Sequence, residues 1–137
     1  MTPLTTAPAA IGLHLDRTTV LHCAADQSMR PLAVNDRAWA DQPSVPAFRD
    51  GRILSVFDYT SSWTWWERHC TGEEYVHVLA GVVVFHVEDA GGRRSVELRA
   101  EAGLVVPRGA WHRAEIRAAA RMLFLTPTPA STEHRDA

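Results

Sequence analysis

Lysine is absent from the sequence, because all fourteen basic residues are arginines. This absence excludes chemistry that depends on a lysine amine, such as a Schiff base or a lysine general base. The net charge is only −2, and the one adjacent basic pair is Arg93-Arg94. The charge therefore gives no reason to expect nucleic acid or an anionic membrane as a partner. Arginine in place of every lysine is also typical of a GC-rich bacterial genome.

Cysteine is scarce, and long apolar runs are missing. Cys23 and Cys70 form no CxxC pair and no disulfide framework, so we expect free thiols in a reducing compartment. The first ten residues contain no basic segment followed by an apolar run, and the sequence predicts neither a signal peptide nor a membrane span. We therefore expect a cytoplasmic protein.

The length of 137 residues, with 46% hydrophobic and 22% charged residues, fits one globular domain. Residues 1–10 and 127–137 are rich in Thr, Pro, Ala or charge. Such segments bury too little apolar surface to offset the entropy lost on ordering, and we expect both to be flexible. The folded domain is then predicted to span residues 11–126.

Short β-type runs separated by turn residues fill this domain. Turns are predicted at residues 70–72, 89–92 and 107–109. The alanine-rich stretch 113–121 could form a helix, but we prefer two strands joined by a turn at 118–120. Many short strands at close spacing predict an all-β sandwich or barrel. The predicted strands are 19–22, 32–34, 52–59, 63–69, 74–79, 82–87, 95–99, 103–106, 112–116 and 122–125.

The first chemically informative segment contains Glu67, His69 and Glu74. Side chains two apart in a strand point to the same face, with Cβ atoms roughly 6–7 Å apart. Glu67 and His69 can therefore converge on one ion held at about 2 Å from each donor. The predicted turn reverses the chain after His69, and we expect Glu74 on the returning strand to reach the same point.

The second informative segment runs from Gly103 to His112. Three apolar residues lead into Pro107-Arg108-Gly109, and His112 follows as the next strand begins. Glycine permits a tight backbone here, so the turn directs His112 back over the sheet.

These two segments resemble the two motifs of the cupin superfamily. The first cupin motif is usually His-x-His, three or four residues, Glu, six residues and Gly. This sequence has Glu67-x-His69, four residues, Glu74, six residues and Gly81. Glutamate at position 67 is the main departure from that motif.

The second cupin motif is usually Gly, five residues, Pro-x-Gly-x-x-His, three residues and Asn. Pro107-x-Gly109-x-x-His112 matches it. Only three residues separate Gly103 from Pro107, and Ile116 occupies the position of the final Asn.

The resemblance covers about residues 53–126, with both motifs inside 63–117. It implies an all-β, single-domain cupin jelly roll, or double-stranded β-helix barrel, with one metal ion near its centre. Small bacterial cupins with Trp-Glu-x-His in the first motif look very similar to this sequence. The metal ligands that the resemblance implies are Glu67, His69, Glu74 and His112.

Several of these residues have alternative roles. Glu67 could be a fourth ligand, a partner that orients a histidine, a catalytic general base, or part of an ion pair with an arginine. Trp63 and Trp65 share its side of the strand and could line a substrate pocket and stack on a planar substrate, or belong to the barrel core. Glu73 could replace Glu74, although its spacing to the following motif glycine is off by one.

Other candidates have weaker support. Trp66 and Trp111 point to the opposite side and suit sheet packing or a dimer face. His77 and His86 lie within apolar strands, and Cys70 points away from the site in a regular strand. We expect structural roles for these three.

A mixed set of histidines and carboxylates suits Fe(II), Mn(II) or Ni(II), with Zn(II) as an alternative. Two histidines and one carboxylate with open positions form the arrangement of non-haem iron oxygenases, whereas a fourth protein ligand leaves fewer open positions. We expect a metal-dependent enzyme, either a dioxygenase or an isomerase or cyclase, that acts on a small organic molecule. The alternative is a non-catalytic module that binds a small ligand or a metal. A sugar isomerase or epimerase is less favoured, since the sequence has no excess of basic residues for a sugar nucleotide.

Cupins commonly pair through edge strands. The strand near residues 19–22 could cross to a partner subunit and cover an exposed edge. We therefore expect a homodimer that binds a small molecule, without nucleic-acid or membrane partners.

Overall fold

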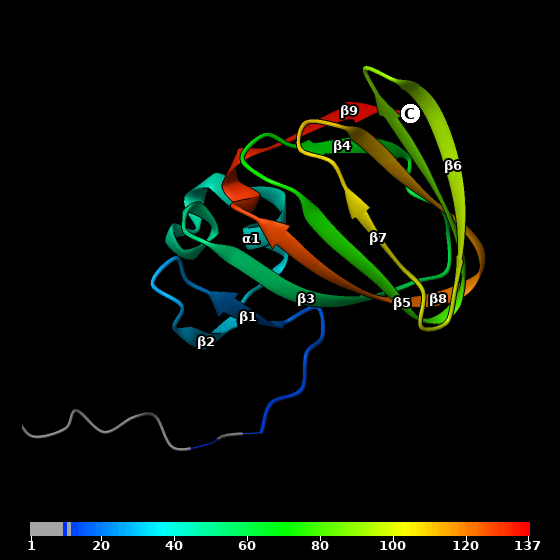
Figure 1. The fold of residues 1–137 in the computed structure, drawn as a ribbon. Coiled ribbons are helices and arrows are strands. Elements are labelled where there is room, and N and C mark those ends of the chain that lie inside the picture. Colours follow the sequence, from blue (N-terminus) through cyan, green and yellow to red (C-terminus); the bar gives the residue numbers. More distant parts are fainter. Residues whose placement is uncertain (1–9, 11) are drawn as a thin grey trace, which may run out of the picture.

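The computed structural model describes residue 10 and residues 12–137. The predicted flexible segment 1–10 thus lies outside the described residues, apart from Ala10. Within the described part, the chain forms one curled nine-stranded sheet with a small helical layer at its N-terminal side (Figure 1). None of the helices in this part of the chain is long and apolar enough to span a bilayer.

The strands account for most of the described residues, and the helical segments are short. The helical segments are α1 (Asp36–Ala40) and the 3-10 turns η1 (Gln42–Ser44), η2 (Pro46–Arg49) and η3 (Pro129–Ser131). The strands are β1 (Thr19–Cys23), β2 (Met29–Ala33), β3 (Arg52–Tyr59), β4 (Trp65–His69), β5 (Glu74–Asp89), β6 (Gly92–Arg99), β7 (Gly103–Val106), β8 (Trp111–Pro127) and β9 (Thr132–Asp136).

The strand order explains how the sheet closes into a barrel. Strands β2, β1, β3, β8, β4 and β9 are neighbours in that order, and β5 pairs with β6, β7 and β8. The two long strands β5 and β8 pair along most of their length and bend together around the barrel. The interior of this curl is where the two predicted motifs meet.

Two expected chain breaks are bends within continuous strands. The predicted strands 74–79 and 82–87 form the single strand β5, and the predicted turn at 118–120 lies inside β8. The register between them shifts between Val78 and Val83. Gly81 allows this close approach, because it has a φ of 89° and a Cβ there would collide with the backbone of Ala119. The apolar pattern is interrupted at this bend in both strands, so the sequence predicted two separate strands in place of β5 and a turn at 118–120 in place of a continuous β8.

The C-terminal segment also differs from the expectation of a flexible tail over 127–137. Strand β9 pairs with the whole of β4, and the two lie side by side in Figure 1. The guanidinium of Arg135 stacks over the rings of Trp66 and Trp111. These contacts are distant in sequence, and the polar composition of the segment gives no local sign of them.

Strand β1 lies at the N-terminal side of the sheet. It pairs with β2 and with β3 of its own chain, so it covers the edge of β3 itself. Val20 on β1 packs with Phe48 and Ile53 in a small cluster that holds the N-terminal layer on the barrel.

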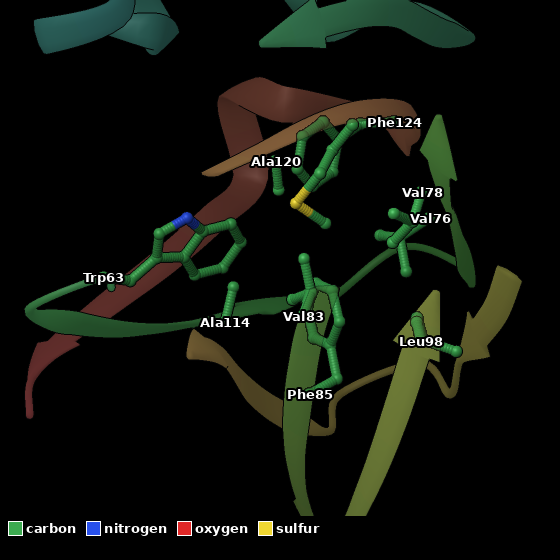
Figure 2. Close-up of a cluster of buried hydrophobic side chains, with 10 residues drawn as sticks. Trp63, Val76, Val78, Val83, Phe85, Leu98, Ala114, Ala120 and Phe124 are labelled. Atoms are coloured by element: carbon green, nitrogen blue, oxygen red, sulfur yellow. The ribbon is translucent and has the colours of Figure 1, made fainter. Parts of the chain in front are cut away.

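The main hydrophobic core fills the part of the barrel away from the N-terminal layer (Figure 2). Most of its buried side chains alternate along β5 and β8, as expected for strands with one face inside a barrel. Its members are Trp63, Val76, Val78, Val83, Phe85, Leu98, Ala114, Ala120, Met122 and Phe124.

Candidate metal centre

Four ionisable side chains converge inside the barrel. Glu67 and His69 come from β4, Glu74 begins β5, and His112 lies at the start of β8. One potential ligand atom from each lies within 4.8 Å of the other three. Donors at about 2.0–2.2 Å from one ion are separated from each other by at most about 4.4 Å, so a shift of a few tenths of an ångström would bring all four onto a single metal ion.

The structure thus brings together the four residues expected from the motifs, but by a different route. The segment between His69 and Glu74 is not a hairpin turn, since β4 pairs with β8 and β9, whereas β5 pairs with β6, β7 and β8. The chain crosses from one part of the curled sheet to another between these residues. Glu67 is directly opposite His112 in the register of β4 and β8. Glu74 therefore reaches the cluster because the sheet closes into a barrel, and not because the chain reverses locally after His69.

The distances within the cluster centre on Glu74. Its two carboxylate oxygens each lie 3.1 Å from an imidazole nitrogen, Oε2 from Nε2 of His69 and Oε1 from Nε2 of His112. Oε2 of Glu67 lies 3.5 Å and 3.8 Å from the same two nitrogens. His69, Glu74 and His112 are at most 2% exposed, and only Glu67 is partly open to the interior space.

Three buried atoms of this cluster lack a hydrogen-bond partner: Nε2 of His69, Oε1 of Glu74 and Nε2 of His112. They are close to one another but are not aligned for hydrogen bonds. Buried polar atoms without partners are costly, and native structures rarely leave three together. A cation bound between them would satisfy all three, so the donor set fits a metal ion.

Neighbouring groups fix the outer side of each histidine. Nδ1 of His112 lies 3.2 Å from the carbonyl oxygen of Ala110 and must donate to it, since a carbonyl only accepts. The neutral ring therefore presents the lone pair of Nε2 to the cluster. Nδ1 of His69 is hydrogen-bonded to the hydroxyl of Thr132, at 3.0 Å. Such partners orient metal-binding histidines and set their tautomers.

The two carboxylates are also held in place. The hydroxyl of Thr126 donates to Oε2 of Glu74 at 2.6 Å, and the indole N–H of Trp65 donates to Oε1 of Glu67 at 2.9 Å. Each carboxylate thus keeps its other oxygen for the centre of the cluster.

The electrostatics match a site that can exchange a proton for a cation. Burial opposes the charge of Glu74, but His69 and His112 outweigh it and hold the pKa of this carboxyl well below its usual range. Burial likewise disfavours the charged form of His112, but the carboxylate of Glu74, 3.1 Å away, outweighs it and raises the pKa of His112 above the ordinary value. The metal-free cluster therefore holds a proton that a metal ion would displace.

A cavity of about 280 Å³ opens beside the cluster toward the N-terminal layer. Its lining includes Glu67, His69 and Glu74 of the cluster, together with Arg17, Trp39 and Gln42 from the N-terminal part of the chain. Aromatic side chains form much of its wall. These are Trp39, Phe57, Tyr59, Trp63, Trp65 and Phe124. The cavity is called the aromatic chamber below.

Sequence reasoning missed several residues of the chamber and cluster. Thr126 and Thr132 lie beyond the matched motifs, and the latter lies in a segment expected to be flexible. Phe57 and Phe124 are on alternate, inward-facing positions of β3 and β8, so strand parity gave a signal for them. Nothing local in the sequence indicated that these two strands flank the candidate ligand cluster.

The remaining candidates lie away from the cluster. His77 is hydrogen-bonded to Tyr75, and His86 to Ser95. The thiol of Cys70 donates to Glu133, and both burial and that carboxylate raise its pKa. Arginine side chains, from Arg68, Arg93 and Arg135, cover the rings of Trp66 and Trp111. Tyr59 lies in the chamber wall, where burial and the charge of Glu67 raise its pKa.

Comparison with known proteins identifies the fold. No family model and no curated protein sequence matches the chain. Among solved structures, the oxalate decarboxylase of Lactobacillus farciminis is 13% identical, with a TM-score of 0.52 over 61% of this chain and 26% of its own. An oxalate oxidase is 18% identical, with a TM-score of 0.51 over 60% of this chain and 45% of its own. A cupin-2 domain protein from Shewanella frigidimarina is 17% identical, with a TM-score of 0.49 over 56% of this chain and 71% of its own.

The two oxalate enzymes, with TM-scores above 0.5, confirm the fold expected from the two motifs. The chain has the cupin fold, an all-β jelly-roll barrel, with a cluster of glutamates and histidines at the position where the motifs meet. The chain spans less than half the length of the two oxalate enzymes, and identities this low establish the fold alone.

Proposed function

We propose that Glu67, His69, Glu74 and His112 bind one divalent first-row metal ion, and that the protein uses this ion to transform a small organic molecule in the aromatic chamber. One observation supports this most directly: three buried ligand atoms point into a shared space and lack any hydrogen-bond partner. A site built only for structural stability would be expected to pair them.

The four residues have different tasks in this proposal. His69, Glu74 and His112 are almost fully buried and provide the fixed part of the coordination. Glu67 is the most open of the four, with 16% of its side chain exposed, and it borders the chamber. It is therefore placed either to coordinate the ion as a fourth ligand or to accept a proton from a substrate.

The donor set suits Fe(II), Mn(II) or Ni(II), with Zn(II) as an alternative. When bound, such an ion would supply Lewis-acid or oxygen-activating chemistry. The protein residues would hold the substrate against the aromatic wall, exclude water, and receive a proton at Glu67. A dioxygenase and an isomerase or cyclase both fit these roles.

A non-catalytic module that binds a metal or small ligand is the second candidate. It is favoured by the hydrogen bond from Trp65 to Glu67, because this bond holds Glu67 beside the other three ligands. Four protein donors leave fewer positions for a substrate than three. Oxygen uptake or product formation with added Fe(II) supports the enzyme, whereas tight ligand binding without turnover supports the module.

Metal content tests the proposal. Protein purified without a His-tag should contain about one divalent ion per chain by elemental analysis. A His112→Ala variant should lose most of it, while far-ultraviolet circular dichroism still reports the β fold. His86→Ala is a matched control, because His86 lies on the same strand pair but is hydrogen-bonded to Ser95 outside the cluster. Equal metal content in His112→Ala and the wild type would reject the ligand assignment.

A further inference from the structure

The aromatic chamber is lined by a continuous series of rings that leads from its N-terminal side to the metal cluster. Trp39 contacts Phe57 edge-on, with ring centroids 5.0 Å apart, and Phe57 lies 6.1 Å from Phe124. Phe124 lies 6.1 Å from Trp63, which stacks on Trp65 at 5.3 Å. A molecule that enters the chamber therefore contacts aromatic surface along its path to the cluster.

Of the two stacked tryptophans, Trp63 and Trp65, only Trp65 has a ring face available to a ligand. Trp63 is 2% exposed, and its ring stacks on Trp65, at an interplanar angle of 8°, and on Phe124, at 29°. Its indole therefore belongs to the core (Figure 2). Trp65 is half-buried, is covered by Trp63 on one face, and lines the chamber. From the sequence, both tryptophans could either stack on a substrate or belong to the barrel core, and the geometry favours stacking for Trp65 alone.

Trp65 also stands next to the metal cluster. Its indole N–H donates to Oε1 of Glu67 at 2.9 Å, which fixes the edge of the ring against the cluster. A ring stacked on the free face of Trp65 would therefore hold its substituents close to the ligand atoms.

The size of the chamber restricts what can bind. A cavity of about 150 Å³ lined by apolar side chains is enough to bind benzene. The aromatic chamber, at about 280 Å³, holds one substituted ring. Offset stacking between aromatic rings favours a planar ligand over a saturated one of the same size.

We propose that the chamber binds a monocyclic aromatic molecule with an oxygen donor, a carboxylate or phenolate, whose ring stacks on Trp65 and whose oxygen points to the metal cluster. The position of the oxygen rests on the proposed function. The ring contact with Trp65 does not depend on a metal ion.

The probes for this proposal are benzoate and cyclohexanecarboxylate, which share charge and approximate size but differ in planarity. Isothermal titration of Zn(II)-loaded protein should show that benzoate binds roughly three- to tenfold more tightly, the range expected for one aromatic stack. Equal affinities, or no binding of either probe, would overturn the proposal.

Two variants locate the contact. Trp65→Leu should abolish the preference for benzoate, and Trp65→Phe should retain most of it, because a ring remains on the wall. Trp66→Phe is the matched control, since the Trp66 ring lies on the other face of β4 beneath Arg93 and Arg135. A benzoate preference that persists in a folded Trp65→Leu variant would contradict the assignment. If that variant does not fold, the benzoate preference measured for the wild type and for Trp65→Phe still tests the proposal.

The same titrations separate this proposal from the proposed function. Wild-type protein that takes up no metal but still prefers benzoate would reject the metal centre and keep the aromatic site. Protein that binds one equivalent of metal but does not prefer benzoate over cyclohexanecarboxylate would keep the metal centre and reject the aromatic site.

Discussion

The hydroxyl of Thr132 lies 3.0 Å from Nδ1 of His69, although 63 residues separate them in the sequence. The pairing of β9 with β4 brings them together, because His69 and Thr132 are directly opposite in that register. The C-terminal strand therefore helps to hold the candidate metal centre in place.

We predict that Thr132→Val weakens metal binding. The valine is close in shape but cannot hydrogen-bond to Nδ1, so the His69 ring loses the partner that orients it. Loss of such a partner typically costs 10- to 100-fold in metal affinity. Competition with a chromophoric chelator measures this change. Thr71→Val, the same substitution at an exposed position in the segment between β4 and β5, should leave the affinity unchanged.

The stability of the metal-free protein should depend on pH through Glu74 and His112. The lowered pKa of Glu74 adds stability above its ordinary value of 4.5, and this is lost as the pH falls through the folded-state value. The raised pKa of His112 adds stability below its ordinary value of 6.5, and this is lost as the pH rises through the folded-state value. The metal-free protein should therefore be most stable between pH 4.5 and 6.5.

Urea unfolding of chelator-treated protein at several pH values measures this dependence. In His112→Gln the decline above pH 6.5 should be absent, since glutamine does not titrate. Metal affinity should follow the opposite trend and increase with pH, because the ion competes with the proton on His112. A metal-free wild type that gains stability between pH 7 and 8 would contradict the assignment of the charged pair.

Gly81→Ala should destabilise the barrel strongly. Its backbone φ is 89°, and an added Cβ would collide with the backbone of Ala119 and Ala120, neither of which can move without disturbing β8. We expect a loss of more than about 2 kcal/mol in the free energy of unfolding, from combined backbone strain and overlap. Gly92→Ala is the control, since its φ of 107° is equally unfavourable but nothing lies within 4 Å of the new Cβ. Similar losses in the two variants would mean that the close approach at Gly81 is unimportant.

A homodimer remains a prediction, and the structure suggests where to test it. A row of apolar side chains crosses the outer face of five neighbouring strands, one residue from each strand. In the order β1, β3, β8, β5 and β7, these residues are Leu21, Leu54, Leu125, Tyr75 and Val105. Tyr75 is 37% and Val105 53% exposed. A second copy of this face would cover them.

Size-exclusion chromatography with light scattering should give twice the chain mass at micromolar concentration. Val105→Glu should reduce it to the monomer mass. Met29→Glu is the control, because Met29 is 63% exposed on β2, outside this row. A wild-type monomer would reject the dimer.

Strand parity and motif spacing predicted the part of the site that depends on local order. Glu67 and His69 point the same way because they are two apart in β4, and the Pro-x-Gly corner aims His112 inward. Glu74 lies beside His69 and His112 because the sheet closes into a barrel, and the local sequence does not show how it closes. The prediction of a hairpin between His69 and Glu74 was wrong for this reason.

The C-terminal strand β9 is a second element whose structure depends on contacts that are distant in sequence. The polar composition of residues 132–136 indicates weak burial, and the burial is indeed weak. The segment is ordered instead by the ladder to β4, by the ion pair of Arg68 with Glu133, and by Arg135 over two tryptophan rings. Each contact joins residues far apart in sequence, so composition alone could not predict it.

Strand β8 touches one carboxylate with both of its ends. His112 approaches Oε1 of Glu74, and Thr126, near the opposite end of the strand, donates to Oε2. The length of β8 between His112 and Thr126 is therefore matched to the path around the barrel, so that both side chains reach Glu74. One residue added or removed between them would turn one of the two side chains to the opposite face of the sheet, away from Glu74. A change in the length of β8 would therefore also break up the cluster.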